Sequence, residues 1–307
     1  MLMIGFVGTE MSEGLAALVD QPLVTGVIWF RRNIVDVDQV ARVNEALRHR
    51  RPELLISVDQ EGGLVRRLRD GVTEVPPMRE VPDIESAAGW GTCLGRELRA
   101  LGFNMNMAPV LDVDSNPDNP VIASRSFGRD PEHVARLAVA LQEAMAARGV
   151  CPVGKHFPGH GDTDQDSHLA LPSVAHDRSR LDTLELVPFR AAIAADIPAI
   201  MTAHVMLPAL DPSEPATLSP RLVRGLLRDE LGYQGVVITD DMEMNAVAER
   251  YQPEVLATKA SQAGCDIQLW CHSEDRQWAA LDALAEQDTR ESMARIAALA
   301  TRFAIGA

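Results

Sequence analysis

Short apolar runs recur along the chain at intervals that leave room for a helix between each pair. Eight such runs have the length of a strand, and they are continuous rather than alternating. Continuous apolar strands are typical of a parallel sheet that is buried on both faces. The expected strands cover residues 1–7, 24–30, 54–59, 103–113, 150–157, 199–206, 235–240 and 265–271. Eight strands that alternate with helices favour a closed barrel over an open sheet.

The segments between these runs carry signals for the start and the end of helices. Asp130 is expected to cap a helix that begins at Pro131 and stops before Gly149. Ser219 is expected to open another helix, which Gly232 closes. We found no linker and no low-complexity tract, so we predict one α/β domain over residues 1–307, a single-domain (β/α)8 TIM barrel.

The last amphipathic segment has apolar side chains at helical spacing. We expect this helix to pack on the outside of the barrel. The apolar positions are Met293, Ile296, Leu299 and Phe303.

Composition and charge limit the possible partners. Of the 307 residues, 46% are hydrophobic, which suffices for a large core. The formal charge of −15 disfavours nucleic acids and anionic membrane surfaces, so a small-molecule partner is expected. The first residues do not resemble a signal peptide, and no apolar run is long enough to span a membrane, so we expect a soluble, cytoplasmic protein. The four cysteines lack motif spacing, and we interpret them as structural.

Polar clusters stand at the ends of the predicted strands, where barrel enzymes place their chemistry. They cover residues 59–63, 112–120, 155–168 and 239–241, with His204 in the sixth strand. The segment 154–168 is the richest, with three histidines, three aspartates and several glycines. An isolated histidine there would suit an ordinary polar loop, but the whole cluster favours a functional site.

Two candidate catalytic groups emerge from these clusters. Asp166 and His168 are two residues apart, so in an extended segment the carboxylate can orient the imidazole as a general acid/base. The alternative is a surface ion pair of little consequence. Asp240 ends an apolar strand, where a buried charge is costly without a purpose. An aspartate there could instead cap the next helix, but Asp241 is available for that role.

A retaining glycosidase requires at least two catalytic groups, a carboxylate nucleophile and an acid/base beside it. Both groups are usually carboxyls, so a histidine acid/base departs from the general scheme.

Four motifs resemble one known family. They are VDQEGG, NPVIASRSFGRDP, KHFPGHGDTDQDSH and GVVITDDMEM, and the resemblance extends from residue 24 to residue 271. They are similar to the β-N-acetylglucosaminidases of glycoside hydrolase family 3, which trim N-acetylglucosamine from muropeptides during bacterial cell-wall recycling. The resemblance implies Asp240 as nucleophile and His168 as acid/base, with Asp166 as its partner.

The same resemblance implies a set of sugar-binding residues, whose polar side chains suit hydroxyl and acetamido groups. They are Asp59, Arg67, Arg125, Lys155 and His156. Without the resemblance, Arg67 would be interpreted as part of a solvated basic run. Strand alternation sends Lys155 and His156 to opposite faces, so the chain must leave regular pleating if both bind sugar.

Three alternatives remain open at this point. A glycoside phosphorylase could use the same residues with phosphate as the acceptor. A metal-dependent hydrolase could use His156 and His160, although Pro158 and the neighbouring glycines interrupt the helix that this spacing requires. A sugar-binding module without catalysis would tolerate the loss of Asp240.

The glycosidase hypothesis requires no metal or organic cofactor. The expected substrate, by resemblance, is N-acetylglucosamine linked to anhydromuramoyl-peptide, and a monomer is expected for a closed barrel.

Overall fold

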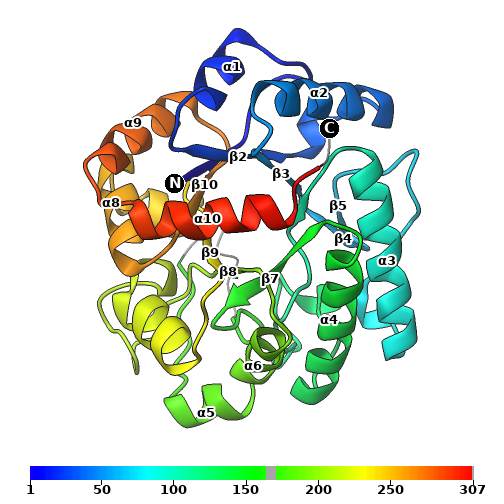
Figure 1. Cartoon of the computed structure of the whole chain (residues 1–307). Helices are drawn as coiled ribbons and strands as arrows, with labels where there is room; N and C mark the ends of the chain where they lie inside the picture. The colour runs from blue at the N-terminus through cyan, green and yellow to red at the C-terminus, as the bar shows by residue number, and fades with distance from the viewer. Residues whose placement is uncertain (164–170, 306–307) are drawn as a thin grey trace.

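The computed structural model describes residues 1–163 and 171–305 and contains a closed barrel of eight parallel strands (Figure 1). The strands are β1 (Leu2–Ile4), β2 (Val24–Trp29), β3 (Leu55–Val58), β6 (Met105–Asn106), β7 (Cys151–Phe157), β8 (Ala199–Thr202), β9 (Val236–Asp241) and β10 (Ile267–Trp270). Each strand pairs with the next along the chain, and β1 closes the ring against β10. The predicted eight-stranded TIM barrel is therefore confirmed.

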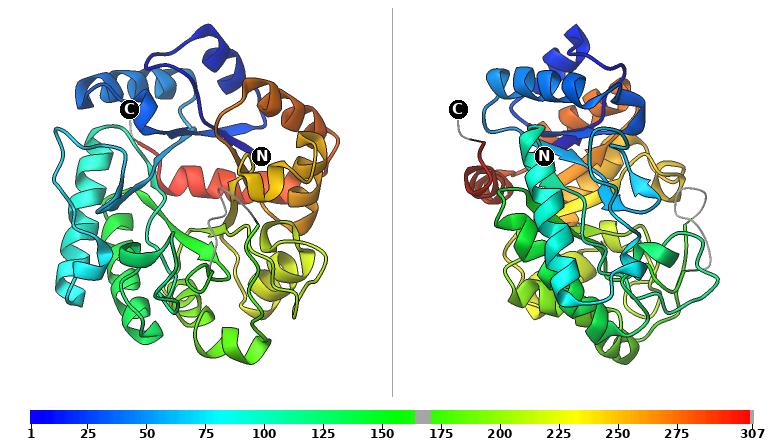
Figure 2. Two further views of the ribbon diagram at one scale, coloured as in Figure 1. Left: turned by 180° about the vertical axis from the view of Figure 1, so that it is seen from behind. Right: turned by 90° about the vertical axis from the view of Figure 1, so that its right-hand side faces the viewer.

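Helices surround this barrel, as the two views in Figure 2 show. They are α1 (Glu13–Val19), α2 (Val37–Arg50), α3 (Ile84–Ala100), α4 (Pro131–Ala146), α5 (Arg178–Thr183), α6 (Leu186–Ala194), α7 (Asn245–Ala248), α8 (Pro253–Ala263), α9 (Glu274–Ala285) and α10 (Arg290–Arg302), with a π-helix over Arg221–Glu230. Asp130 caps α4 by accepting from the backbone N–H of Glu132, and Pro131 occupies the first turn, as predicted. No helix in the described part of the chain is long and apolar enough to cross a membrane.

The strands are buried on both faces because two apolar clusters lie against them. One cluster fills the space between the barrel and the surrounding helices and includes Trp29, Phe157 and Trp270. The other fills the barrel interior and includes Met3 and Ile238. This two-sided burial explains why the strands read as continuous apolar runs in the sequence.

Helix α10 lies across the N-terminal end of the barrel instead of beside the other helices (Figure 1). Ile296, Leu299 and Phe303 belong to the same buried cluster as the barrel interior. The prediction that this helix packs on the outside of the barrel was therefore wrong. Its apolar face closes the bottom of the barrel, which leaves the opposite end for the chemistry.

The fourth predicted strand is much shorter than its apolar run, because β6 covers two residues of the expected 103–113. Pro109 has no N–H to donate to a strand neighbour, and beyond β6 a single bridge joins Val110 to Lys155. The side chains of Asn104 and Asn106 replace part of the ladder by bonding to the backbone of the β3 segment. The irregular stretch carries the chain directly into the site.

Candidate active site

A cavity of about 400 Å³ opens at the C-terminal end of the barrel. Its walls contain Asp240 and all five residues expected to bind sugar, which are Asp59, Arg67, Arg125, Lys155 and His156. Further wall residues are Ile28, Phe30, Val65, Val121, His160, Met201, Asp241, Met244, Leu269, Cys271 and His272. The expected positions therefore converge on one site, although they come from segments more than 180 residues apart.

Strand alternation explains why two of these charged groups point into the barrel. Successive side chains of a strand face opposite sides, so every second residue shares a face. On β9, Val236 and Ile238 face the interior, and Asp240 is the next residue of that series. On β7, Lys155 continues the inward series of Cys151 and Val153. The charged residues thus extend the apolar interior at the end where the barrel opens.

A small hairpin of β4 (Gln60–Gly62) and β5 (Val65–Arg66) brings Arg67 to the cavity. Gln60 is buried, and its side-chain oxygen accepts from the backbone N–H groups of Arg67 and Leu68, at 3.0 Å each. The Arg67 guanidinium then lies 3.1 Å from the Asp59 carboxylate. The DQEGG segment therefore forms a turn that fixes the Arg67 guanidinium against the Asp59 carboxylate.

Five charged side chains form a connected network on one wall of the cavity. The Lys155 ammonium contacts Asp59 at 2.8 Å and Glu61 at 2.6 Å. Arg125 binds both oxygens of Glu61, at 2.8 and 2.9 Å. Lys155 and Glu61 are almost inaccessible, with side-chain exposures of 3% and 2%. Every buried charge in this network faces an opposite charge, which a buried site requires.

The network keeps its carboxyl groups ionised. Burial alone would raise the pKa of Asp59, but Lys155 and Arg67 outweigh that effect and hold the pKa below its ordinary value. Burial likewise opposes ionisation of Glu61, yet Arg125 and Lys155 lower its pKa. The pKa of Lys155 is raised by these two carboxylates in spite of its burial. At neutral pH this wall presents fixed acceptors and donors for hydroxyl groups.

Lys155 and His156 both reach the cavity because the regular pleating of β7 is interrupted there. The register between β7 and β8 shifts between Gly154 and Phe157. His156 Nδ1 lies 2.7 Å from the buried carboxylate of Asp112, which also accepts from the backbone N–H of His160 at 2.7 Å. The chain therefore leaves regular pleating at these two residues, and both side chains line the cavity.

Asp112 is completely buried and determines how His156 is oriented. Burial would raise the pKa of Asp112, but His156 and the donated hydrogen bonds hold it below its ordinary value. A carboxylate can only accept, so Nδ1 of His156 bears the shared hydrogen and Nε2 is left to face the cavity.

His160 does not pair with His156 in the way that the metal-dependent alternative requires. The two rings are 5.9 Å apart and nearly perpendicular, and Nδ1 of His160 lies 2.8 Å from the Thr163 hydroxyl. Burial and the neighbouring His156 lower the pKa of His160 to about 4. Among residues 1–163 and 171–305, no group of three or more His, Cys, Asp and Glu side chains is placed to hold a metal ion.

The end of β9 is held from two sides. His204, which is completely buried, lies 2.9 Å from the carbonyl oxygen of Asp241, so its Nε2 must carry the donated hydrogen. The Asp241 carboxylate lies 3.1 Å from His272 Nε2. The backbone N–H of Asp241 in turn donates to the Asp240 carboxylate at 2.8 Å. Asp241 therefore has a structural role that leaves Asp240 to the cavity.

Asp166 and His168 lie outside the described residues, so their roles stay predictions. Sequence analysis did not single out Glu61, Asp112 or His272 individually. Glu61 stands two residues after Asp59, and Asp112 ends an apolar run just as Asp240 does, so both carried a signal. For His272 the sequence offers no comparable signal.

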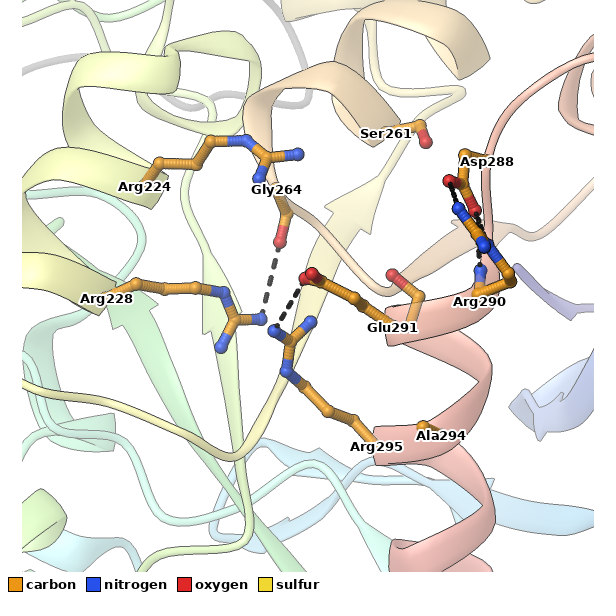
Figure 3. Close-up of a pocket in the computed structure, with 10 residues that line it drawn as sticks. Arg224, Arg228, Ser261, Gly264, Asp288, Arg290, Glu291, Ala294 and Arg295 are labelled. Carbon is orange, nitrogen blue, oxygen red and sulfur yellow. Dashed lines mark hydrogen bonds and ion pairs between the residues drawn. The ribbon is translucent and has the colours of Figure 1, made fainter.

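A second cavity of about 660 Å³ lies at the other end of the barrel, beside the first turn of α10 (Figure 3). Four arginines line it, and protein groups already engage each of them. Arg228 binds the buried Asp266 at 2.6 Å, Arg295 binds Asp266 and Glu291, and Arg290 pairs with Asp288. Arg224 donates to the carbonyl of Gln262. None of the residues expected from the sequence to form the site lines this larger cavity.

Comparison with known proteins identifies the family of this chain. The model of the family described as "Glycosyl hydrolase family 3 N terminal domain" matches residues 1–304. The chain belongs to glycosyl hydrolase family 3. A β-hexosaminidase of Nitrosomonas eutropha is 37% identical over 320 residues, which cover 96% of this chain and 91% of that one. A β-hexosaminidase of Alkalilimnicola ehrlichii is 40% identical over 302 residues, with coverage of 95% and 86%.

Solved structures of this family superpose closely on the barrel. A glycoside hydrolase family 3 β-N-acetylglucosaminidase from Paenibacillus matches with a TM-score of 0.96 and 48% identity, over 100% of this chain and 62% of that one. NagZ from Neisseria gonorrhoeae, in complex with N-trifluoroacetyl-D-glucosamine, matches with a TM-score of 0.89 and 34% identity, over 99% and 90%. The chain therefore spans less than two thirds of the Paenibacillus protein. These relatives confirm the prediction that the chain is a β-N-acetylhexosaminidase of family 3.

Proposed function

We propose that this family 3 enzyme removes terminal non-reducing N-acetylglucosamine by a two-step, retaining mechanism. The observation that supports the proposal most strongly is the single cavity that unites Asp240 with Asp59, Arg67, Lys155 and the other expected binding residues. In the relative from Neisseria gonorrhoeae, N-trifluoroacetyl-D-glucosamine is the bound molecule, which suits the same substrate here.

In the first step the Asp240 carboxylate attacks the anomeric carbon and the glycosidic bond breaks. His168, oriented by Asp166, gives a proton to the departing oxygen. In the second step His168 removes a proton from water, which attacks the anomeric carbon and releases Asp240 from the glycosyl ester. The charged wall of Asp59 and its partners holds the sugar hydroxyls throughout.

The natural substrate that we propose is N-acetylglucosamine linked to anhydromuramoyl-peptide, so that the enzyme serves cell-wall recycling. A cytoplasmic site of action suits the four cysteines, which are all unpaired, because disulfides are rare in that compartment. We also propose that residues 1–307 act as one domain and as a monomer without a metal or organic cofactor. Size-exclusion chromatography with light scattering would test the monomer.

Release of nitrophenol from 4-nitrophenyl N-acetyl-β-glucosaminide tests the activity. Asp240→Asn is expected to lower kcat at least about a thousandfold, because the amide is a poor nucleophile. Asp288→Asn, at the far end of the barrel, is the matched control and leaves the rate unchanged. Strong dependence of the wild-type rate on added phosphate would instead support the phosphorylase. A silent wild type that still binds N-acetylglucosamine would support the binding module.

The acid/base is tested by comparing two leaving groups. Nitrophenol departs with little help from an acid, whereas a sugar hydroxyl needs a proton. His168→Ala is therefore expected to slow the cleavage of N-acetylglucosaminyl disaccharides more than the release of nitrophenol. Equal losses on both substrates would contradict the assignment of His168.

A further inference from the structure

Two side chains meet across the segment of the chain that carries the proposed acid/base. Residues 163–175 include Asp166 and His168, and Asp162 and His176 stand directly before and after them. Nε2 of His176 lies 2.9 Å from a carboxylate oxygen of Asp162, and both side chains are partly buried. Because a carboxylate can only accept, Nε2 carries the hydrogen that this contact shares. The contact therefore joins the two ends of the segment.

The upstream stem, residues 159–163, is held against the wall of the cavity. The buried side chain of Asn119 donates to the carbonyl oxygen of His160 at 2.8 Å and to the hydroxyl of Thr163 at 3.2 Å. His160 is itself part of the cavity wall. The position of the upstream stem is therefore fixed relative to the site.

The downstream stem, residues 171–176, is bound to the stretch of chain that follows β8. The backbone N–H of Val174 donates to the carbonyl oxygen of Met206 at 3.0 Å, and the N–H of Met206 donates to the carbonyl oxygen of Pro172 at 2.8 Å. The upstream stem instead continues β7. The two stems thus extend from neighbouring strands, and the contact between His176 and Asp162 connects them.

A third carboxylate supports this contact from the helical layer. Glu185 is buried, lies 3.8 Å from Nε2 of His176 and accepts from Arg180 of α5 at 3.1 Å. The side chain of Glu185 also packs against Gly159, where a β-carbon would come within 2.8 Å of its Cγ. Glu185 therefore touches both stems at once, and a buried arrangement of this kind is more costly to break than a surface ion pair.

We propose that His176 and Asp162 are positioning residues for the acid/base, because they fix both ends of the segment that carries it. This inference rests on the proposed function. A segment whose ends are joined has fewer conformations to explore, and a misplacement of about 1 Å can cost a reaction about 100-fold in rate. Neither residue is part of the cavity wall. Their replacement is therefore expected to impair proton transfer and to leave the binding of the sugar intact.

Two aryl glucosaminides with different leaving groups test this role. Phenol is a poorer leaving group than nitrophenol, so its departure depends more on a proton from the acid/base. We expect His176→Gln to lower kcat/KM about tenfold for phenyl N-acetyl-β-glucosaminide and less than about twofold for the 4-nitrophenyl substrate. Asp162→Asn keeps the shape of the side chain and is expected to act in the same way. A residue that only stabilised the fold would change both values alike.

A second comparison shows whether the effect passes through His168. In His168→Ala the acid/base is already absent, so His176→Gln is expected to change kcat/KM for the phenyl substrate less than about twofold further. His49→Gln is the matched control, because it removes a histidine that lies 3.7 Å from Glu45 on the exposed surface of α2. This control is expected to leave both kcat/KM values unchanged.

The outcomes separate this inference from the proposed function. Equal losses on both substrates, or a loss in the His168→Ala background as large as in the wild type, would overturn the positioning role. Nitrophenol release by the wild type would still uphold the proposed function in that case. A wild type that cleaves neither substrate would overturn both.

Discussion

Replacement of Lys155 by methionine tests whether the buried charge network stabilises the barrel. The substitution keeps the length and apolar stem of the side chain and removes its charge. Lys155 contacts Asp59 at 2.8 Å and Glu61 at 2.6 Å, and its side chain is 3% exposed. At an effective dielectric constant of about 20, each contact corresponds to about 6 kcal/mol of Coulomb energy, from which several kcal/mol of dehydration must be subtracted.

The net loss in the free energy of unfolding is smaller than these Coulomb energies. Removal of one partner from a buried ion pair typically destabilises a protein by about 3–5 kcal/mol. We expect the lower end, about 3 kcal/mol, because Asp59 keeps Arg67 and Glu61 keeps Arg125. For a chain of this length that loss lowers Tm by about 5 °C.

The loss must also depend on pH. In the wild type the pKa values of Asp59 and Glu61 are lowered, so their stabilising effect is present above the ordinary carboxyl pKa of about 4 and disappears as the pH falls through the lowered values. Without Lys155 the pKa values of Asp59 and Glu61 rise, because one of the cations that lower them is gone. The two carboxylates of the variant are therefore protonated at a higher pH than in the wild type, which removes their uncompensated negative charge. The difference in stability between the two proteins should therefore be largest at neutral pH and narrow below about pH 4.

Thermal unfolding followed by circular dichroism at pH 7 and at about pH 3 measures both effects. Lys259→Met is the matched control, because Lys259 is 34% exposed and pairs with Glu214 at 2.7 Å. An exposed pair contributes under about 1 kcal/mol, so the control should shift Tm by no more than about 2 °C. A shift for Lys155→Met no larger than that of the control, or one that is the same at both pH values, would refute the reasoning.

Three further predictions concern the site and the closed end of the barrel. Asp112→Asn replaces a carboxylate that accepts from His156 and His160, and it is expected to lower kcat/KM for the nitrophenyl substrate about 10- to 100-fold; a change below twofold would show that Asp112 does not orient His156. Phe303→Ala empties a position that is 2% exposed beneath the barrel, and urea unfolding should show a loss of about 3–5 kcal/mol with an unchanged kcat/KM. Dialysis against EDTA is expected to leave the hydrolytic rate unchanged, because the proposed chemistry uses Asp240 and His168 alone; a loss restored by one divalent metal would contradict that mechanism.

Much of the barrel could be predicted because burial on both faces leaves a continuous apolar run in each strand. The run at 103–113 was misleading, because hydrophobicity reports burial and does not report whether the backbone is paired. There Pro109 interrupts the ladder because it has no N–H group, and the asparagine side chains take over part of the backbone hydrogen bonding. The position of α10 was misjudged for a related reason. Helical periodicity identifies the apolar face but not which surface that face covers.

The site was predictable where a residue's position in a strand determines its direction. Asp240 ends an inward-facing apolar series, whereas Asp59 and Lys155 were expected from the resemblance to glycoside hydrolase family 3, and the structure brings all three to one cavity. Partners that depend on distant segments could not be assigned in this way. Arg125 meets Glu61 across 64 residues, and Arg32 meets His272 across 240 residues. Such contacts arise from closure of the barrel and leave no local pattern in the sequence.

The central claim is that Asp240 forms the covalent intermediate, and mass spectrometry of a trapped enzyme tests it most directly. A 5-fluoro analogue of an N-acetylglucosaminyl fluoride is expected to react quickly and to be released slowly, which allows the ester to accumulate. We expect an added sugar mass on the proteolytic peptide that contains Asp240, and no such adduct in Asp240→Asn. An adduct on a different residue, or turnover of the analogue without any adduct, would contradict it.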